Sequence, residues 1–156
     1  TLLVHADRVD VLPRVLGALR DAGVELRGDE RAQAAAGFEI AAATDEDWDA
    51  EYLDLILAVR VVDDLDAALD HIDRHSTGHS EAIVTDSIEA ARRFTDGVDS
   101  ACVYVNASTR FTDGGEYGMG AEVGNSTARL HVRGPIGLED LTTTKYVVIG
   151  TGQTRT

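Results

Sequence analysis

The feature that most constrains the fold is an alternation of short apolar runs with helical stripes between residues 55 and 105. The run at 55–62 is apolar and largely β-branched apart from Arg60, which is typical of a strand covered on both faces of a sheet. The runs at 82–85 and 101–105 predict two further strands. Because strands that alternate with helices form parallel sheets with right-handed crossovers, the sequence predicts an α/β protein with a parallel sheet flanked by helices.

Two amphipathic helices are expected between these strands. Asp63 or Asp64 can cap the first helix, whose apolar face is formed by Leu65, Ala68, Leu69 and Ile72. Asp86 can cap the second helix, whose apolar face is formed by Ile88, Ala91 and Phe94. The residues Ser76-Thr77-Gly78 predict that the first helix ends before His79.

The N-terminal third gives a less regular pattern. Residues 1–5 predict a strand, and Asp10 is a candidate N-cap for a helix over about 10–22. A short strand is expected around 24–26. Residues 28–50 are polar, acidic and weakly periodic, and we expect a surface excursion without regular structure.

The alternation of strand and helix patterns ends at Asn106. Glycines at 114, 115, 118, 120 and 124 predict a long irregular loop, and one last strand is expected at 145–149. A length of 156 residues suits a single domain. We expect about 1–135 to form its α/β part and about 136–156 to form a C-terminal strand and tail.

Composition excludes several classes of function. The chain has 28 Asp and Glu against 14 Lys and Arg, a formal net charge of −14. Nucleic acids and anionic membranes are therefore not expected as partners, because both repel an acidic surface. The longest apolar runs fall far short of the roughly 20 residues that a membrane span needs. Cys102 is the single cysteine, so no intrachain disulfide forms, and we expect a cytoplasmic protein.

No cluster of residues predicts a metal site. His71, His75 and His79 are four residues apart and would share one face of a continuous helix. The helix is expected to end before His79, however, and no carboxylate completes a ligand set, so we interpret them as exposed helix histidines followed by a loop histidine. The acidic run at 63–66 lacks the spacing of a calcium loop and is interpreted as acids at a helix start.

Two further motifs have weak functional interpretations. Cys102 could act as a nucleophile, but it lies inside an expected strand with no base adjacent in the sequence, so a buried, inert thiol is favoured. Gly118-Met119-Gly120 could form a phosphate-binding turn, but the preceding strand is expected to end at Val105, too far upstream for a dinucleotide fingerprint. A chain-reversing surface loop is favoured there.

The segment 105–114 is the best candidate for a binding site. It begins where a strand of the parallel sheet is expected to end, and ligands of open α/β sheets bind beyond the carboxyl ends of strands. An amide, hydroxyls and a guanidinium that suit a carboxylate or phosphate come from Asn106, Ser108, Thr109 and Arg110. A polar loop held by its own Asx and hydroxyl turns is the alternative.

Several long motifs resemble one enzyme family. Residues 62–72 (VDDLDAALDHI) and 75–83 (HSTGHSEAI) closely resemble the hallmark segment of the gamma-glutamyl phosphate reductases, also called glutamate-5-semialdehyde dehydrogenases. Residues 105–115, 118–122 and 130–135 resemble further motifs of that family, so the resemblance covers essentially the whole chain. It implies an aldehyde-dehydrogenase-like architecture, in which this chain is a C-terminal portion of the catalytic domain and its last strand makes oligomer contacts.

The resemblance also implies that other parts of the enzyme lie outside this chain. The family's nucleophilic cysteine precedes a strand similar to residues 1–5, and its cofactor-binding domain lies further upstream. We therefore expect both upstream of Thr1, and we expect the isolated chain to be inactive; Cys102 does not match the nucleophile. The implied reaction of the intact enzyme is reduction of L-glutamyl 5-phosphate with NADPH to L-glutamate 5-semialdehyde and phosphate, in L-proline biosynthesis.

Individual residues take roles from the same resemblance. Glu51 matches the glutamate that contacts the nicotinamide ribose, and the loop that anchors the far end of the substrate corresponds to Asn106, Ser108, Thr109 and Arg110. No metal and no catalytic residue is expected in the chain itself. A homo-oligomer is implied, and an association with glutamate 5-kinase is suggested. Two alternatives stay open, namely a non-catalytic assembly module and another acyl-reducing relative of the aldehyde dehydrogenases.

Overall fold

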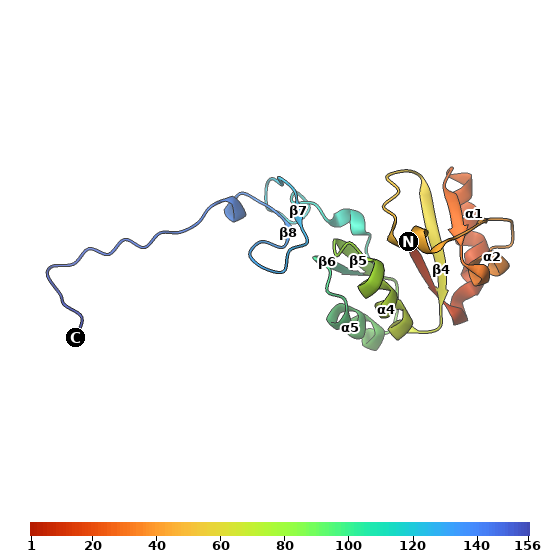
Figure 1. Cartoon of the computed structure of the whole chain (residues 1–156), viewed down its shortest axis with the longest axis horizontal. Helices are drawn as coiled ribbons and strands as arrows, with labels where there is room; N and C mark the ends of the chain where they lie inside the picture. The colour runs from red at the N-terminus through yellow and green to blue at the C-terminus, as the bar shows by residue number, and fades with distance from the viewer.

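The computed structural model describes residues 1–156 and contains a four-stranded parallel sheet (Figure 1). Its strand order is β1-β4-β2-β3, formed by Leu2–His5, Ile56–Val62, Glu25–Gly28 and Ala41–Ala42. β4 is central, since Val59 aligns with Leu2 of β1 on one side and with Gly28 of β2 on the other. The strands expected near 1–5, 24–26 and 55–62 are confirmed, with ends that differ by one or two residues.

Strands β5 (Ser80–Ile83) and β6 (Cys102–Val105) form a separate parallel pair. The α/β class with parallel strands and flanking helices is confirmed, but the three strands of the 55–105 segment do not pair within one sheet. The reason is that β1 and β2 occupy both edges of β4, so β4 has no free edge for β5. β5 also begins and ends two residues earlier than the expected 82–85.

Helices cover both faces of β4. α1 (Leu12–Asp21) and α2 (Glu30–Ala35) pack against Val59 and Val61 in the main hydrophobic core. Because side chains alternate along a strand, Arg60 points to the other face, where it reaches α4 (Leu65–His75). α5 (Ile88–Gly97) packs beside α4 and against β6.

The predicted N-cap is confirmed for α4 and is wrong for α5 and α1. Asp64 caps α4 as expected, its carboxylate accepting a backbone N–H at 2.8 Å. Ser87, rather than Asp86, caps α5. Asp10 does not cap α1, because it lies within a 3-10 helix, η1 (Ala6–Val11), that precedes it.

Residues 28–50 are ordered, which corrects the expectation of an irregular excursion. They contain α2, β3 and a short helix, α3 (Asp45–Asp49). Asp29 ties the segment to the sheet, because its carboxylate both caps α2 and accepts the Val61 N–H of β4 at 3.2 Å. Elements this short have too few residues for a periodic pattern, so the sequence does not reveal them.

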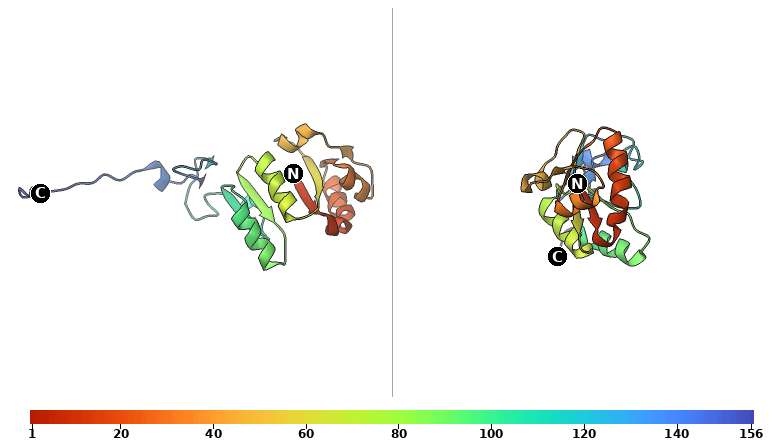
Figure 2. Two further views of the ribbon diagram at one scale, coloured as in Figure 1. Left: turned by 60° about the horizontal axis from the view of Figure 1, so that its bottom comes forward. Right: turned by 90° about the vertical axis from the view of Figure 1, so that its right-hand side faces the viewer.

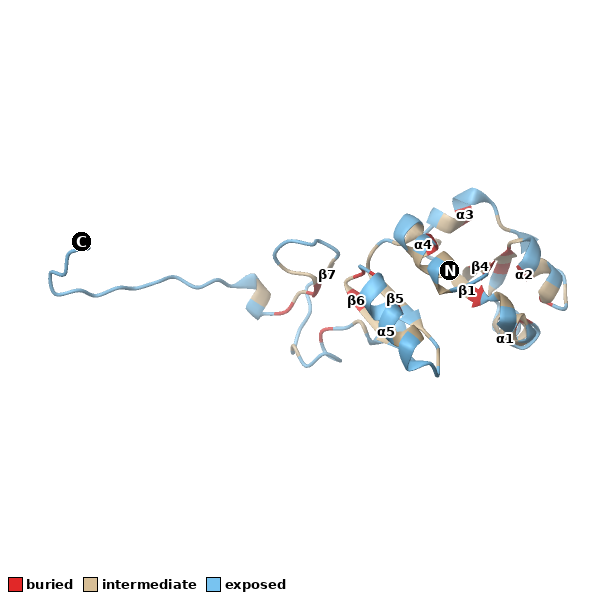
Figure 3. Cartoon of the chain, turned by 90° about the horizontal axis from the view of Figure 1, so that it is seen from below, coloured by how far each residue is buried: buried red, intermediate tan, exposed pale blue.

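The chain after β6 leaves the α/β body and ends in an extended arm that is exposed almost throughout (Figure 3). This part contains η2, β7, β8 and η3, formed by Thr109–Phe111, Asn125–Ser126, Gly134–Pro135 and Glu139–Leu141. The strand expected at 145–149 is absent, because no neighbouring strand offers hydrogen bonds there. Tyr146 and Ile149 are 95% and 92% exposed. No helix in the chain is both long enough and apolar enough to cross a bilayer.

Candidate functional site

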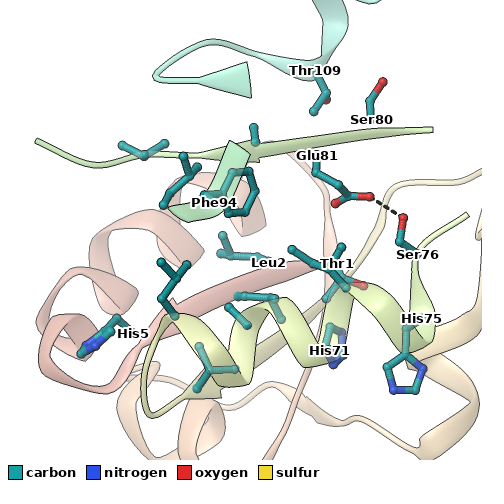
Figure 4. Close-up of a pocket in the computed structure, with 18 of the residues that line it drawn as sticks. Thr1, Leu2, His5, His71, His75, Ser76, Ser80, Glu81, Phe94 and Thr109 are labelled. Carbon is teal, nitrogen blue, oxygen red and sulfur yellow. Dashed lines mark hydrogen bonds between the residues drawn. The ribbon is translucent and has the colours of Figure 1, made fainter. Parts of the chain in front are cut away.

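A cavity of about 1050 Å³ lies between β1 of the first sheet and β5 of the second (Figure 4). The left view of Figure 2 shows α4 between the two sheets. The apolar part of the cavity lining includes Leu2, Leu65, Ala68, Ile72, Ile83 and Phe94. The polar part includes Glu51, Ser76, Ser80, Glu81, Asn106 and Thr109. Three residues predicted from the sequence, Glu51, Asn106 and Thr109, therefore meet at one cavity, whereas Ser108 and Arg110 are not in its lining.

The segment that carries Glu51 is held in place by Asp47, which is 5% exposed. The Asp47 carboxylate accepts hydrogen bonds from the Thr44 N–H and hydroxyl at 2.7 and 3.1 Å. It also accepts from the Tyr52 hydroxyl at 2.6 Å and from Arg27 at 2.8 Å. These bonds, the Thr44 backbone first, hold the pKa of Asp47 well below its usual range. Burial, and then the neighbouring Asp47 carboxylate, raise the pKa of Tyr52 to about 12.

Aromatic and charged neighbours hold the same segment against α4. The Trp48 ring meets His71 edge-on, with 5.6 Å between ring centroids, and the Arg60 guanidinium lies 5.4 Å from the Trp48 centroid. The Asp49 carboxylate lies 2.7 Å from Nδ1 of His75. α3 is thereby fixed to the helix that lines the cavity, and Glu51 lies exposed just beyond it.

His71 is only 7% exposed, which corrects its interpretation as an exposed helix histidine. Arg60 can only donate, so Nδ1 of His71, 2.9 Å away, accepts, and the ring is neutral with its proton on Nε2. Burial, followed by the positive fields of His75 and Arg60, lowers the pKa of His71 to about 4. The structure contains no group of three or more His, Cys, Asp or Glu side chains placed to hold a metal ion.

Asn106 is engaged within the fold. Its Oδ1 accepts the Thr85 N–H, and its Nδ2 donates to the Thr85 carbonyl, both at 2.8 Å. Its φ of 56° lies in the left-handed region, which asparagine tolerates better than most residues. The Asn106 side chain therefore links the ends of β5 and β6, and it uses one acceptor site and one N–H of its amide to do so.

The other residues of the predicted binding loop differ in their availability. The Ser108 hydroxyl accepts the Arg110 N–H at 3.2 Å, which is the local hydroxyl turn that the sequence left open as an alternative. The Thr109 side chain lines the cavity. The Arg110 guanidinium is exposed and forms no ion pair. The loop thus offers one hydroxyl inside the cavity and one free cation outside it.

Sequence reasoning missed a polar cluster on β5. Glu81 accepts hydrogen bonds from the Ser76 and Ser100 hydroxyls. Ser80 shares a hydrogen bond of 2.7 Å with the Thr112 hydroxyl. No local signal marks Glu81, because its partners are brought to it by the end of α4 and the start of β6. The Asp47 cluster did have a signal, since Thr44 and Asp47 have the spacing of a capping box.

The lining of the cavity can bind a polar ligand but lacks an activated nucleophile. Its carboxylates and hydroxyls supply hydrogen-bond acceptors and donors. Cys102 is not in the lining and is 7% exposed, as the sequence predicted for a buried thiol. The chain therefore presents a polar binding surface at this cavity.

Similarity to known proteins is strong over the whole chain, although no protein-family model matches it. Curated proteins named gamma-glutamyl phosphate reductase are 62%, 56% and 59% identical to it, from Thermobifida fusca, a Thermoanaerobacter species and Lacticaseibacillus casei. Each match covers 99% of this chain and 37% of the relative, so the chain spans little more than a third of their length.

Solved structures give the same result. The crystal structure of gamma-glutamyl phosphate reductase from Thermotoga maritima matches with a TM-score of 0.93 and 50% identity, covering 99% of this chain and 37% of that chain. The structure of that name from Saccharomyces cerevisiae matches with a TM-score of 0.52 and 32% identity, covering 68% of this chain. The α/β architecture described above is thus shared with solved proteins of that name.

Proposed function

Because the chain is homologous to a portion of gamma-glutamyl phosphate reductases, we propose that it forms part of an oxidoreductase with that activity. The enzyme reduces L-glutamyl 5-phosphate with NADPH to L-glutamate 5-semialdehyde and phosphate, a step of L-proline biosynthesis in the cytoplasm. The observation that carries the proposal is 62% identity to a relative of that name over 99% of the chain. The TM-score of 0.93 to a solved protein of that name supports it.

The proposal assigns a place to each part of the chain. Residues of about 1–135 belong to the α/β part of a catalytic domain, and about 136–156 supply a C-terminal strand that pairs in an oligomer. The cysteine nucleophile and the cofactor-binding domain belong to the part of the longer polypeptide outside this chain. The isolated chain is then inactive, and NADPH-dependent turnover by the 156 residues alone would contradict this assignment.

Glu51 is assigned to the cofactor. Its carboxylate lies at the cavity and makes no hydrogen bond within the chain, so both oxygens can accept hydrogen bonds from ribose hydroxyls. NADPH, when bound, supplies the hydride that reduces the activated acyl carbon. The bonds of Asp47 to Arg27 and Tyr52 fix the segment before the cofactor arrives, which lowers the entropic cost of orienting it.

The loop after β6 is assigned to the far end of the substrate. Arg110 pairs with a carboxylate or phosphate, and the Thr109 hydroxyl helps to orient the same group. Asn106 and Ser108 shape the loop, because their side chains bind Thr85 and the Arg110 N–H. Asn106 keeps a second amide N–H and Ser108 keeps its hydroxyl proton, and both can donate to the substrate.

Kinetics of the longer polypeptide test these assignments. Arg110→Ala should lower kcat/KM for the phosphorylated substrate by about tenfold or more, because losing a charge-assisted hydrogen bond costs about 1.5–3 kcal/mol. Glu51→Gln should raise the KM for NADPH with a smaller effect on the substrate. Arg92→Ala is the matched control, since Arg92 is exposed on α5 without an ion pair. Constants within about twofold of wild type for Arg110→Ala would refute the anchoring role.

The exposed C-terminal arm supports a second role for the chain, namely assembly with other chains. The four side chains from Tyr146 to Ile149 are apolar or aromatic and 71% to 95% exposed, which suits pairing with another chain. This exposure supports a homo-oligomer, and an association with glutamate 5-kinase is included in the proposal on the family resemblance alone. Light scattering of the longer polypeptide, with and without the kinase, tests both. A substrate panel on the same protein tests the alternative of another acyl-reducing aldehyde dehydrogenase relative.

A further inference from the structure

A continuous row of polar side chains lies on the face of β5 and β6 that is turned away from Phe94 of α5. Ser80 points to one side of β5, whereas Glu81 points to the side of Phe94 (Figure 4). Tyr104 of β6 is aligned with Ala82, so it shares the face of Ser80, because side chains alternate along a strand. The segment after β6 packs on this face, since η2 contacts both strands.

Thr112 is at the centre of this row. Its hydroxyl lies 2.7 Å from the Ser80 hydroxyl and 2.7 Å from the Tyr104 hydroxyl. Tyr104 extends the row to the Tyr117 hydroxyl, and Ser80 extends it to Nδ1 of His79 at 2.8 Å. A hydroxyl donates one hydrogen bond and can accept another, so the three inner hydroxyls are satisfied whichever way the protons point along the row.

Thr112 also ends the short helix that carries the proposed substrate-binding side chains. Its N–H donates to the Thr109 carbonyl at 3.0 Å and closes η2. At the start of the helix, the Ser108 hydroxyl accepts the Arg110 N–H. Residues 106–111 are all exposed, so packing holds this helix only weakly. Within residues 107–112, the half-buried Thr112 hydroxyl makes the hydrogen bonds to β5 and β6.

We propose that Thr112 is a positioning residue for the reductase reaction. Its two hydroxyl bonds fix η2 to β5 and β6, and they thereby hold Arg110, with Thr109 beside it, where the far end of the phosphorylated substrate binds. The inference rests on the proposed function, in which the loop after β6 anchors that end. A charged side chain on a fixed helix loses less conformational freedom on binding than one on a mobile loop, so the link strengthens substrate binding.

The hydroxyl row excludes direct contact of the Thr112 hydroxyl with the substrate. That hydroxyl has one proton, and it already has a partner on each side, Ser80 and Tyr104. It therefore acts through Arg110. The same bonds could also serve stability alone, and the two roles differ in which kinetic constant changes and in whether the effect depends on Arg110.

Kinetics of the longer polypeptide test the proposal with one variant that removes the hydroxyl and one that keeps it. Thr112→Val should raise the KM for the phosphorylated substrate about fivefold or more and leave the KM for NADPH within about twofold. Thr112→Ser should restore both constants to within about twofold of wild type. Tyr104→Phe, which removes one partner of the hydroxyl, should raise the KM for the same substrate. Thr95→Val is the matched control, because Thr95 is exposed on α5 and its hydroxyl binds the Arg92 carbonyl of the same helix.

A double-mutant cycle separates positioning from stability. In an Arg110→Ala background, Thr112→Val should change kcat/KM by less than about twofold, because the group that Thr112 positions is gone. A variant that only weakens the fold would have its full effect in both backgrounds.

Trypsin cleavage after Arg110, followed by mass spectrometry, tests the link without the reaction. Thr112→Val should speed this cleavage about fivefold or more, because a segment released from its anchor opens more often. Cleavage after Arg92, inside α5, should keep its wild-type rate, since it requires unfolding of that helix.

Four results would overturn the proposal in an active enzyme. They are a wild-type KM in Thr112→Val, a KM effect that remains in Thr112→Ser, a full effect of Thr112→Val in the Arg110→Ala background, and an unchanged rate of cleavage after Arg110. A wild-type polypeptide without reductase activity would instead refute the proposed function, and the cleavage rate would still decide whether Thr112 fixes η2.

Discussion

Truncation of Asp47 should weaken the fold far more than truncation of any exposed acid nearby. Asp47 is almost fully buried, and its carboxylate is the shared acceptor for Thr44, Tyr52 and Arg27. Asp47→Ala removes the reciprocal cap of α3 and the 2.6 Å bond of the half-buried Tyr52 hydroxyl, which keeps only the longer 3.4 Å bond to the backbone carbonyl of residue 47. Asp45→Ala is the matched control, because Asp45 is an exposed acid in the first turn of the same helix.

The expected cost follows from the bonds that are lost. Loss of a helix cap costs about 1 kcal/mol, and an unsatisfied polar group in a part-buried site costs a further 1 kcal/mol or more, roughly. The Arg27 side chain is 31% exposed, so solvent screens its charge-assisted bond to Asp47. No free energy is added for that bond. The sum is a loss of about 2–3 kcal/mol in the free energy of unfolding. For Asp45→Ala we expect less than about 0.5 kcal/mol.

Urea unfolding of the 156-residue chain provides the assay. Trp48 is the single tryptophan and adjoins Asp47, so its fluorescence reports on this segment, while circular dichroism reports on the whole fold. With a slope of about 2 kcal/mol per molar urea, the midpoint should fall by about 1–1.5 M. Coincident transitions from both probes are required for this conversion. A shift below about 0.3 M, or an equal shift for Asp45→Ala, would refute the reasoning.

Two further predictions follow from residues that sequence reasoning placed differently. The folded-state pKa of His71 is about 4, below the usual value of 6.5, so protonation favours the unfolded chain; this contribution to stability is present above pH 6.5 and is lost as the pH falls toward 4. His71→Gln should flatten the stability profile in that window, whereas His131→Gln, at an exposed loop position, should not, and equal profiles for wild type and His71→Gln would contradict the burial argument. Asn106→Ala should lower stability by about 1–3 kcal/mol in thermal unfolding, since it breaks both bonds to Thr85 and places alanine at a left-handed φ. Unchanged melting of Asn106→Ala would show that the link between β5 and β6 is dispensable.

Local patterns predicted the elements that depend on few neighbours in the sequence. The apolar run of β4, the stripe of α4 and the Asp64 cap are each encoded within one element, so periodicity and capping chemistry identified them. The family resemblance was also found from local information, because each of its motifs is a contiguous stretch of sequence. The regular structure of residues 28–50 was not predicted, because α2, β3 and α3 are too short to show a periodic pattern.

The sequence by itself determined an acidic α/β chain with parallel strands and a candidate loop after β6. Only the tertiary structure decided what the polar residues do, because their partners are far away in the chain. Asp47 binds Arg27 across 20 positions, and Asn106 binds Thr85 across 21. The separation of β5 from β4 was also decided there, since strand pairing depends on which edges other strands already occupy. Local patterns carry no information about such long-range competition, so the burial of Asp47 and the engagement of Asn106 with Thr85 emerge only when the chain is folded.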